Sequence, residues 1–146
     1  MHLLICNDTL RWNSSFTEIP YWIMTMQIKY KQITGSETPP ILQQGAAIVD
    51  IRRPEEWQLT GTVADSILLT FFDAGGNSDP TGWLQQLNQQ VATDVPLVLI
   101  WRTGRRTSLV CEYLVEVTSR KDVYNVSDGI FGWLTADLPV VGGIYP

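Results

Sequence analysis

The stretch that decides the fold of this 146-residue chain is Leu97-Val98-Leu99-Ile100-Trp101-Arg102-Thr103-Gly104-Arg105-Arg106-Thr107-Ser108. It opens on four apolar residues, which are typical of a short buried strand. A loop with one glycine and three arginines follows at once, and residues 109–117 contain neither Gly nor Pro, which favours a helix. Because the first turn of a helix leaves several N–H groups unpaired, a strand that enters a helix through such a loop is suited to hold an anion.

The rest of the chain repeats this alternation of short apolar runs and helical patterns. The sequence predicts strands at residues 27–33, 46–52, 67–69, 97–100 and 123–126 and helices at residues 41–44, 53–57, 83–91, 109–117 and 127–134. The period-two pattern of residues 27–33 indicates a half-exposed edge strand. Residues 71–80 are rich in turn formers and predict a long mobile loop. This order favours an α/β fold, with a mainly parallel central sheet flanked by helices on both faces.

The charge of the chain limits the classes of partner. A net charge of −5 leaves no basic surplus to neutralise phosphates, so we expect no nucleic-acid binding. The arginines are nevertheless uneven, since Arg102, Arg105 and Arg106 crowd one loop and Arg52 and Arg53 crowd another. A single arginine most often pairs with an acidic residue of its own chain. A local cluster of arginines on an acidic chain nevertheless predicts a small anion or a protein partner at that loop.

The cysteines and the hydropathy of the sequence indicate which cofactors and which cellular location to expect. Cys6 and Cys111 have no spacing typical of a disulfide framework or a metal site, so we expect no metal and no cofactor. A reducing, cytoplasmic location is the default for such a chain. No apolar run has the length of a membrane span, and the first six residues lack the charged start of a signal peptide, so we expect no membrane association. The oligomeric state stays open.

The domain organisation is one domain at residues 26–146, preceded by residues 1–25 as an N-terminal extension of uncertain order. The extension contains apolar segments without clean periodicity, and Met24 and Met26 lie just upstream of the first predicted strand. Either the extension is weakly ordered, or a strand or short helix within it caps the domain. The sequence favours neither interpretation.

A second charged motif follows the predicted strand at residues 46–52. It reads Asp50-Ile51-Arg52-Arg53-Pro54-Glu55-Glu56-Trp57, with the proline at the expected first position of a single helical turn. An arginine a few residues before a glutamate can brace such a turn by a charge-assisted hydrogen bond. We therefore expect Arg52 to pair with Glu56, with Asp50, Arg52 and Glu56 in structural roles.

These two motifs carry a resemblance to the rhodanese (sulfurtransferase) family. The loop resembles the family's Cys-Arg-x-Gly-x-Arg-Ser/Thr pattern, in which Arg102, Gly104, Arg106 and Thr107 match and Trp101 stands where the family has its catalytic cysteine. Residues 50–57 resemble the family's Asp-x-Arg-x-Pro-x-Glu-aromatic signature. Residues 61–67 and 127–134 match further family segments in part, with Asp128 in place of a glycine, so the likeness runs over about residues 28–141 in family order.

The resemblance implies a fold more directly than an activity. In the family, the loop cysteine attacks a sulfane sulfur donor and carries a persulfide to an acceptor, which requires a thiolate. An indole offers one N–H donor and no such nucleophile. The resemblance thus implies a rhodanese-like domain without a catalytic residue, whose loop binds an anion or a protein through the residues Trp101, Arg102, Thr103, Gly104, Arg105, Arg106 and Thr107. In this picture Arg102 and Arg105 attract the anion and Thr107 helps to cap the helix.

Several alternatives stay open at this point. Cys111, Cys6 or a partner's thiol could replace the missing nucleophile and restore sulfur transfer or sulfur carriage. The loop could also be vestigial in a purely structural domain. Residues 71–80, which the family places beside the loop, are either a lid or a plain surface connection. Trp101 either fills the pocket from inside or stands exposed among the arginines as an interaction anchor.

Overall fold

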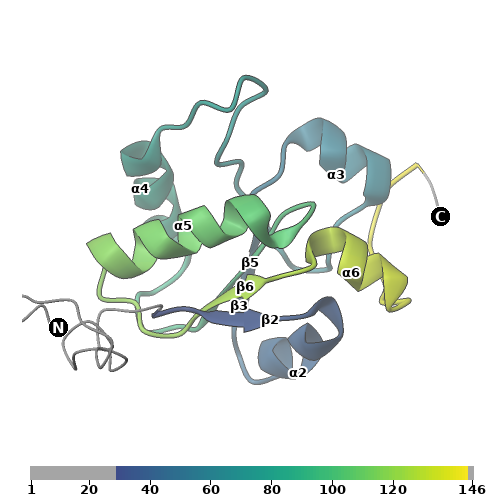
Figure 1. Ribbon diagram of the computed structural model, residues 1–146, viewed down its shortest axis with the longest axis horizontal. Helices are drawn as coiled ribbons and strands as arrows, with labels where there is room; N and C mark the ends of the chain where they lie inside the picture. Colours follow the sequence, from purple (N-terminus) through teal and green to yellow (C-terminus); the bar gives the residue numbers. More distant parts are fainter. Residues whose placement is uncertain (1–28, 145–146) are drawn as a thin grey trace, which may run out of the picture.

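The structure, a computed structural model, describes residues 29–144 (Figure 1). The expectations for residues 1–25, Cys6 among them, therefore lie outside the described residues. Five strands form one parallel sheet with the order β2-β6-β5-β3-β4. The strands are β2 (Lys31–Ile33), β3 (Ala47–Asp50), β4 (Ile67–Leu68), β5 (Leu97–Ile100) and β6 (Val123–Val126).

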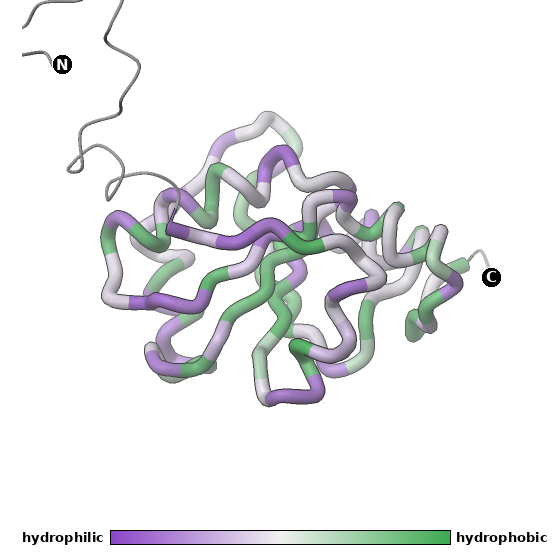
Figure 2. Tube along the Cα trace, turned by 60° about the horizontal axis from the view of Figure 1, so that its bottom comes forward, coloured by the Kyte–Doolittle hydropathy of each residue, from purple (hydrophilic) through white to green (hydrophobic). Residues whose placement is uncertain are grey.

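Two apolar cores enclose this sheet, because successive side chains of a strand point to opposite faces. Leu97 and Leu99 of β5 face the core covered by α4 (Pro80–Gln90) and α5 (Gly104–Val117). Val98 and Ile100 face the core covered by α2 (Thr38–Gln43) and α6 (Gly129–Thr135). Figure 1 shows α5 and α2 on opposite sides of the sheet, and Figure 2 shows apolar segments running through the middle of the molecule. The predicted α/β architecture is confirmed, and the described sheet is entirely parallel.

Most strands and helices lie where the patterns predicted them, but their bounds differ. Strand β2 covers only Lys31–Ile33 of the predicted residues 27–33, of which 27 and 28 lie outside the described residues, and the helices differ at their ends. The 3-10 helix η1 (Gly35–Glu37) precedes α2, and α3 (Pro54–Thr60) is a full helix where the pattern predicted a single turn. Helix α4 begins at Pro80, where the Asp79 side chain accepts the Gly82 N–H. Helix α5 begins earlier, at Gly104. Apolar periodicity detects only the packed middle of a helix, whereas polar first turns depend on capping groups.

The segment between β4 and α4, which the sequence predicts as a long loop, contains hydrogen bonds of its own. Phe72 and Ser78 form an antiparallel bridge, and the Asp73 carboxylate accepts the N–H groups of Gly75 and Asn77. The turn therefore makes its own hydrogen bonds, as short hairpins with an Asx turn do. Among residues 29–144, no helix has both the length and the apolar character needed to cross a membrane.

Candidate functional site

The arginine loop lies at the carboxyl end of the central strand, beside the turn that follows β3. The two strands are in register so that Asp50 pairs with Ile100, and Ile51 N–H donates to the Ile100 carbonyl at 3.1 Å. Both strands then leave the sheet in the same direction and enter helices. In open parallel sheets, the crevice beyond these carboxyl ends is the usual place for a binding site.

Gly104 permits a close approach that shapes the loop. Its N–H donates to the Ser127 carbonyl at 3.0 Å, and a Cβ at this position would lie 2.6 Å from Ser127 Cα. Because the nearest atoms are backbone, they cannot rotate away as a side chain would. A glycine is therefore required where α5 begins against the turn between β6 and α6.

The first turn of α6 holds the loop from the other side. Ile130 N–H donates to the Trp101 carbonyl at 2.7 Å, and Phe131 N–H donates to the Arg102 carbonyl at 3.4 Å. Gly129 has a φ of +60°, and a Cβ there would lie 2.5 Å from the Trp101 carbonyl oxygen. The Trp101 and Arg102 carbonyls therefore point toward α6, and the loop is held between the first turns of α5 and α6.

Trp101 points inward. Its side chain is 8% exposed and belongs to the core beneath α4 and α5. The Arg102 guanidinium carbon lies 4.7 Å from the centre of the indole ring, and the Arg106 guanidinium carbon lies 5.2 Å from it. Cations over an aromatic face are attracted by its quadrupole. Of the two orientations open from the sequence, the structure shows the pocket-filling one.

Arg106 links the loop to the turn after β4. Its guanidinium carbon lies 4.9 Å from the Phe72 ring centre, and a Cβ on Gly76 would lie 3.7 Å from its Nη2. Phe72 also packs edge-to-face against Phe71 of the core, at 4.8 Å between ring centres. The segment at residues 71–79 is thus anchored over the loop by a cation–π contact.

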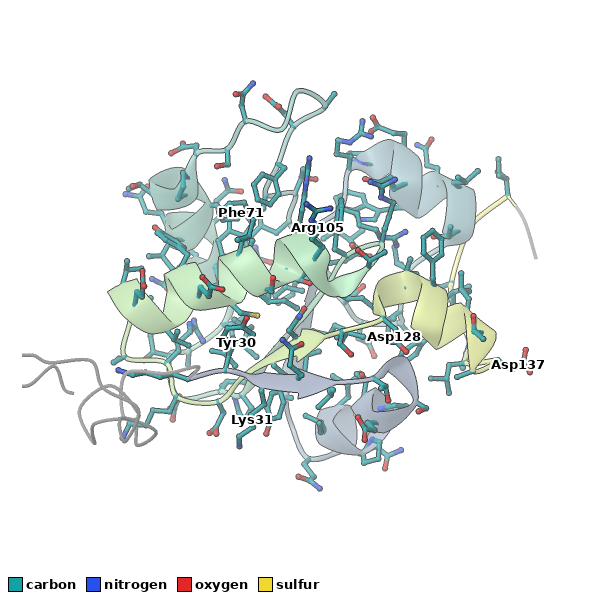
Figure 3. All side chains as sticks on the ribbon, in the orientation of Figure 1. Tyr30, Lys31, Phe71, Arg105, Asp128 and Asp137 are labelled. Atoms are coloured by element: carbon teal, nitrogen blue, oxygen red, sulfur yellow. The ribbon has the colours of Figure 1, made fainter. Side chains whose placement is uncertain are left out.

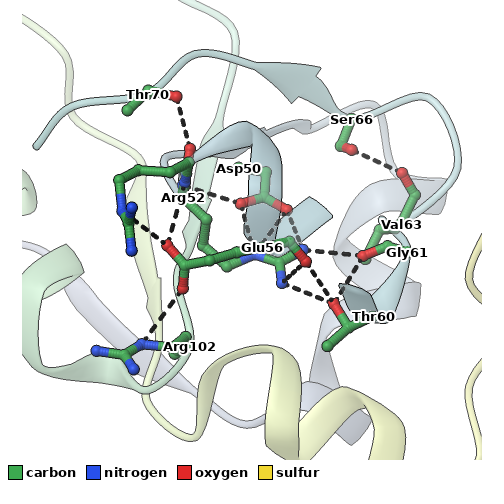
Figure 4. A network of polar contacts seen from close by, with 10 residues as sticks. Asp50, Arg52, Glu56, Thr60, Gly61, Val63, Ser66, Thr70 and Arg102 are labelled. Carbon is green, nitrogen blue, oxygen red and sulfur yellow. Dashed lines mark hydrogen bonds and ion pairs between the residues drawn. The ribbon is translucent and has the colours of Figure 1, made fainter. Parts of the chain in front are cut away.

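Arg102 and Arg105 present their side chains to solvent. The Arg102 side chain is 54% exposed, and its Nε lies 3.3 Å from Glu56 Oε1 (Figure 4). Glu56 Oε2 meanwhile accepts the Arg53 N–H at 3.2 Å. Arg105 is exposed on the first turn of α5. The loop therefore shows two cationic groups at its surface while its aromatic residue is buried.

The two threonines of the loop make different contacts, and the one expected to cap α5 does not do so. Thr103 is the N-cap of α5, and its hydroxyl accepts the Arg105 N–H at 3.4 Å. Thr107 is fully buried, and its hydroxyl donates to the Gly104 carbonyl and to Asn125 Oδ1 of β6. The expectation that Thr107 caps the helix is wrong, because Thr103 is the N-cap and the Thr107 hydroxyl lies on the side of α5 that packs against β6.

The expected pairing of the Arg52 and Glu56 side chains is also wrong. Arg52 Nε donates to Asp50 Oδ1 at 3.0 Å and Nη2 to Asp50 Oδ2 at 2.8 Å, with both side chains fully buried (Figure 4). Arg52 Nη1 reaches Thr60 Oγ1 at 2.7 Å and only the backbone carbonyl of Glu56, at 3.3 Å. Its Nη2 also donates to the Gly61 carbonyl at 2.9 Å. The Asp50 carboxylate accepts two N–H groups of the Arg52 guanidinium. The Glu56 carboxylate is therefore free to contact Arg53 and Arg102.

Cys111 is the one cysteine within the described residues, and it lies in the core. It is fully buried on α5, and its thiol points to the Tyr124 carbonyl at 3.8 Å. Burial, with a smaller contribution from the negative charge of Glu112, raises the pKa of the Cys111 thiol far above its ordinary value. The thiol is therefore neutral and shielded at physiological pH.

Sequence reasoning named Glu56 and the segment at residues 71–80, but it missed Asn125 and did not predict the contacts that hold the loop. Asn125 and Phe72 contact Thr107 and Arg106, and Glu56 contacts Arg102 across 46 positions. These contacts join elements that are distant in sequence, so no local pattern specified which side chains would meet. Among the described residues, no group of three His, Cys, Asp or Glu side chains gathers closely enough to hold a metal ion.

Comparisons with known proteins agree with this geometry. The model of the Rhodanese-like domain matches residues 37–136, more than half of the chain. No curated protein matches the sequence significantly.

Several solved structures share the fold. The M. tuberculosis protein Rv0390 has 22% identity and a TM-score of 0.66, over 77% of this chain and 98% of its own. A rhodanese-like domain protein from Staphylococcus aureus has 25% identity and a TM-score of 0.54, over 70% and 90% of the two chains. The polysulfide-sulfur transferase of Wolinella succinogenes has 17% identity and a TM-score of 0.63, over 85% and 87%. The fold, the order of the motifs and the family match together show that this chain belongs to the rhodanese-like domain family.

Proposed function

We propose that this rhodanese-like domain is a non-catalytic module that binds an anionic group, from a small molecule or a protein, through residues 101–107. The observation that carries the proposal is the buried indole of Trp101 at the start of the loop, 8% exposed, with two guanidinium groups over its ring. By its likeness to the family loop, Trp101 occupies the position of the sulfur-carrying cysteine. An indole cannot form a persulfide.

Cys111 is a poor replacement for that cysteine. Its thiol lies inside α5 against β6, with no exposed surface, and its raised pKa keeps it protonated. A sulfur donor would have to reach it through the packed core beneath the helix. The described part of the chain thus supports binding by the loop more than sulfur transfer from it.

The binding groups are the exposed arginines and the helix start. Arg102 and Arg105 carry the positive charge, and Thr103 orders the backbone by capping α5. Stacking of Arg102 on Trp101 restricts its guanidinium before a ligand arrives, which lowers the entropy cost of binding. The tryptophan therefore contributes by orienting a cation.

The test is thiosulfate:cyanide sulfurtransferase activity of the native chain beside Trp101→Cys and Trp101→Ser. We expect thiocyanate formation only from Trp101→Cys, because it alone adds a thiol at the first position of the loop, where the family has its cysteine. Trp101→Ser removes the same indole and controls for the cavity that either substitution leaves. Circular dichroism should establish that both variants fold before their activity is compared.

Activity in the native chain would overturn the proposal and favour a sulfurtransferase that uses Cys6 or a partner's thiol. Alkylation supplies a second readout. In a Cys6→Ser variant, Cys111 should resist iodoacetamide at pH 8 and react only when a denaturant unfolds the chain. Rapid alkylation of the native protein would show that the Cys111 thiol is accessible.

A further inference from the structure

The exposed residues in and next to the arginine loop include both arginines and large apolar side chains. We define this loop face by its exposed residues, which come from the loop, from α5 and from α6: Arg102, Thr103, Arg105, Leu109 and Phe131. Leu109 is 55% exposed and Phe131 is 51% exposed, although both are large apolar residues. Arg105 and Leu109 lie one helical turn apart on α5 and so share one side of it.

The cations of this face retain unused hydrogen-bond donors. The Arg102 side chain has one ion pair, from Nε to Glu56, within residues 29–144. The Arg105 side chain makes no hydrogen bond or ion pair among the described residues, whereas the buried Arg52 fills its donors with Asp50, Thr60 and Gly61. Guanidinium groups prefer planar carboxylates, which they bind by two parallel N–H groups.

A shallow groove of about 480 Å³ continues from Phe131 along α6. Its lining residues are Ser36, Asp128, Phe131, Gly132, Thr135 and Ala136. Phe131 N–H donates to the Arg102 carbonyl, so the start of α6 that carries this exposed residue adjoins the cationic loop. Figure 3 shows Arg105 on the first turn of α5 and Asp128 where α6 begins. The groove thus offers an extended chain a path away from the arginines.

The charge at the loop face indicates which kind of partner segment can bind there. The whole protein carries a net charge of −5, whereas the exposed Arg102 and Arg105 lie together at this one end of the sheet, with Glu56 as the one acidic partner of Arg102 among the described residues. An acidic partner is repelled by most of the surface and attracted here, which orients its approach. The exposed Phe131 ring adds apolar area of the kind that anchors protein contacts.

We propose that the loop face binds an extended acidic segment of a partner protein. Carboxylates of that segment pair with Arg102 and Arg105, and an adjoining apolar side chain packs on Phe131. An uncharged continuation of the segment enters the groove, because Asp128 is the one charged residue within residues 29–144 that lines it. The inference rests on the proposed binding function of the loop and names its partner class.

The experiment selects ligands from a displayed library of random twelve-residue peptides on the immobilised full chain. We expect the enriched peptides to combine several Asp or Glu residues with a neighbouring apolar residue. Synthetic copies should bind in fluorescence anisotropy and weaken as salt increases. Arg102→Gln, Arg105→Gln and Phe131→Ser should each lower their affinity about tenfold.

Lys121→Gln is the matched control, since it removes an exposed positive charge just before β6, at the amino ends of the parallel strands and so at the opposite end of the sheet from the loop. It should leave peptide affinity unchanged. Failure to enrich acidic peptides, or equal losses in Lys121→Gln and Arg105→Gln, would overturn the inference. So would a native dimer in sedimentation that Phe131→Ser dissociates, because a second copy of the chain would then occupy the face. None of these outcomes depends on sulfurtransferase activity, so the proposed function is tested separately.

Discussion

The turns after β3 and β5 place the same residue type at equivalent positions and use it in opposite ways. Asp50 and Ile100 pair in the sheet, so Arg52 and Arg102 each stand two residues beyond their strand. Arg52 is fully buried and bonded on all sides, whereas the Arg102 side chain is 54% exposed with one ion pair (Figure 4). Helices begin two residues later in both turns, at Pro54 and Gly104.

The difference between the turns lies in the residue that ends each strand. Asp50 places a carboxylate under Arg52, and the buried charge then needs further acceptors, which Thr60 and Gly61 supply. Ile100 offers no charge, so Arg102 stays at the surface over Trp101. One acidic residue thus separates a structural turn from a turn whose cation is available to a ligand.

The largest expected effect comes from breaking the buried pair. Arg52→Met leaves the Asp50 carboxylate buried without its partner, which should lower the free energy of unfolding by about 3–5 kcal/mol. Urea unfolding followed by circular dichroism measures the change. Arg53→Met is the control, because the Arg53 side chain is 34% exposed, and its effect should be much smaller. Equal effects would mean that burial does not distinguish the two arginines.

The helix starts should differ as well. Gly104→Ala forces a Cβ against the Ser127 backbone and should cost about 1–3 kcal/mol of unfolding free energy. The equivalent change in the other turn, Pro54→Ala, should cost less than about 1 kcal/mol, since a first helical turn accepts either residue. Thermal and urea unfolding of the two variants compare them directly. A Gly104→Ala variant as stable as native would show that α5 can move away from Ser127.

Glu56 contacts residues of both turns, so removing its charge tests how much each turn depends on it. Glu56→Gln weakens the contacts to the Arg53 N–H and to Arg102 and should lower the free energy of unfolding by about 1 kcal/mol. Part of the loss should disappear in 1 M salt, where ion pairs are screened. Glu55→Gln, whose side chain is 61% exposed, should have almost no effect. A salt-independent loss would locate the effect in the hydrogen bond to Arg53 alone.

The smallest expected effect belongs to the exposed arginine. Arg102→Gln should change the free energy of unfolding by no more than about 1 kcal/mol, because an exposed ion pair contributes little. Unfolding in urea measures this beside Arg52→Met. A loss as large as that of Arg52→Met would contradict the division into a structural and an exposed turn.

Local patterns predicted much of the fold. The apolar run at residues 97–100 and the alternation at 27–33 indicated a buried central strand and an edge strand, and β5 and β2 occupy those places. The helix predicted at residues 127–134 corresponds to α6, whose Trp133 is 4% exposed. Helix starts were less accurate because capping by Asp79 and Thr103 depends on side-chain direction, which periodicity does not encode.

The candidate site was predicted as a segment and not as a set of contacts. Residues 101–107 stood out because glycine and arginines follow a strand without a linker. The orientation of Trp101, the burial of Thr107 and the contact of Arg102 with Glu56 depend on α6, β6 and α3, which are distant in sequence. The pairing of β5 with β3 on one side and with β6 on the other brings these elements together.

The sequence by itself determined the order of strands and helices and the charge of the loop, because periodicity, glycine and arginine act locally. Only the tertiary structure decided which arginine is buried and which is exposed. Arg52 and Arg102 have the same side chain at the same distance from a strand end, and their environments differ through Asp50 and Ile100. Desolvation of a charge depends on everything packed around it, and that packing exists only in the folded chain.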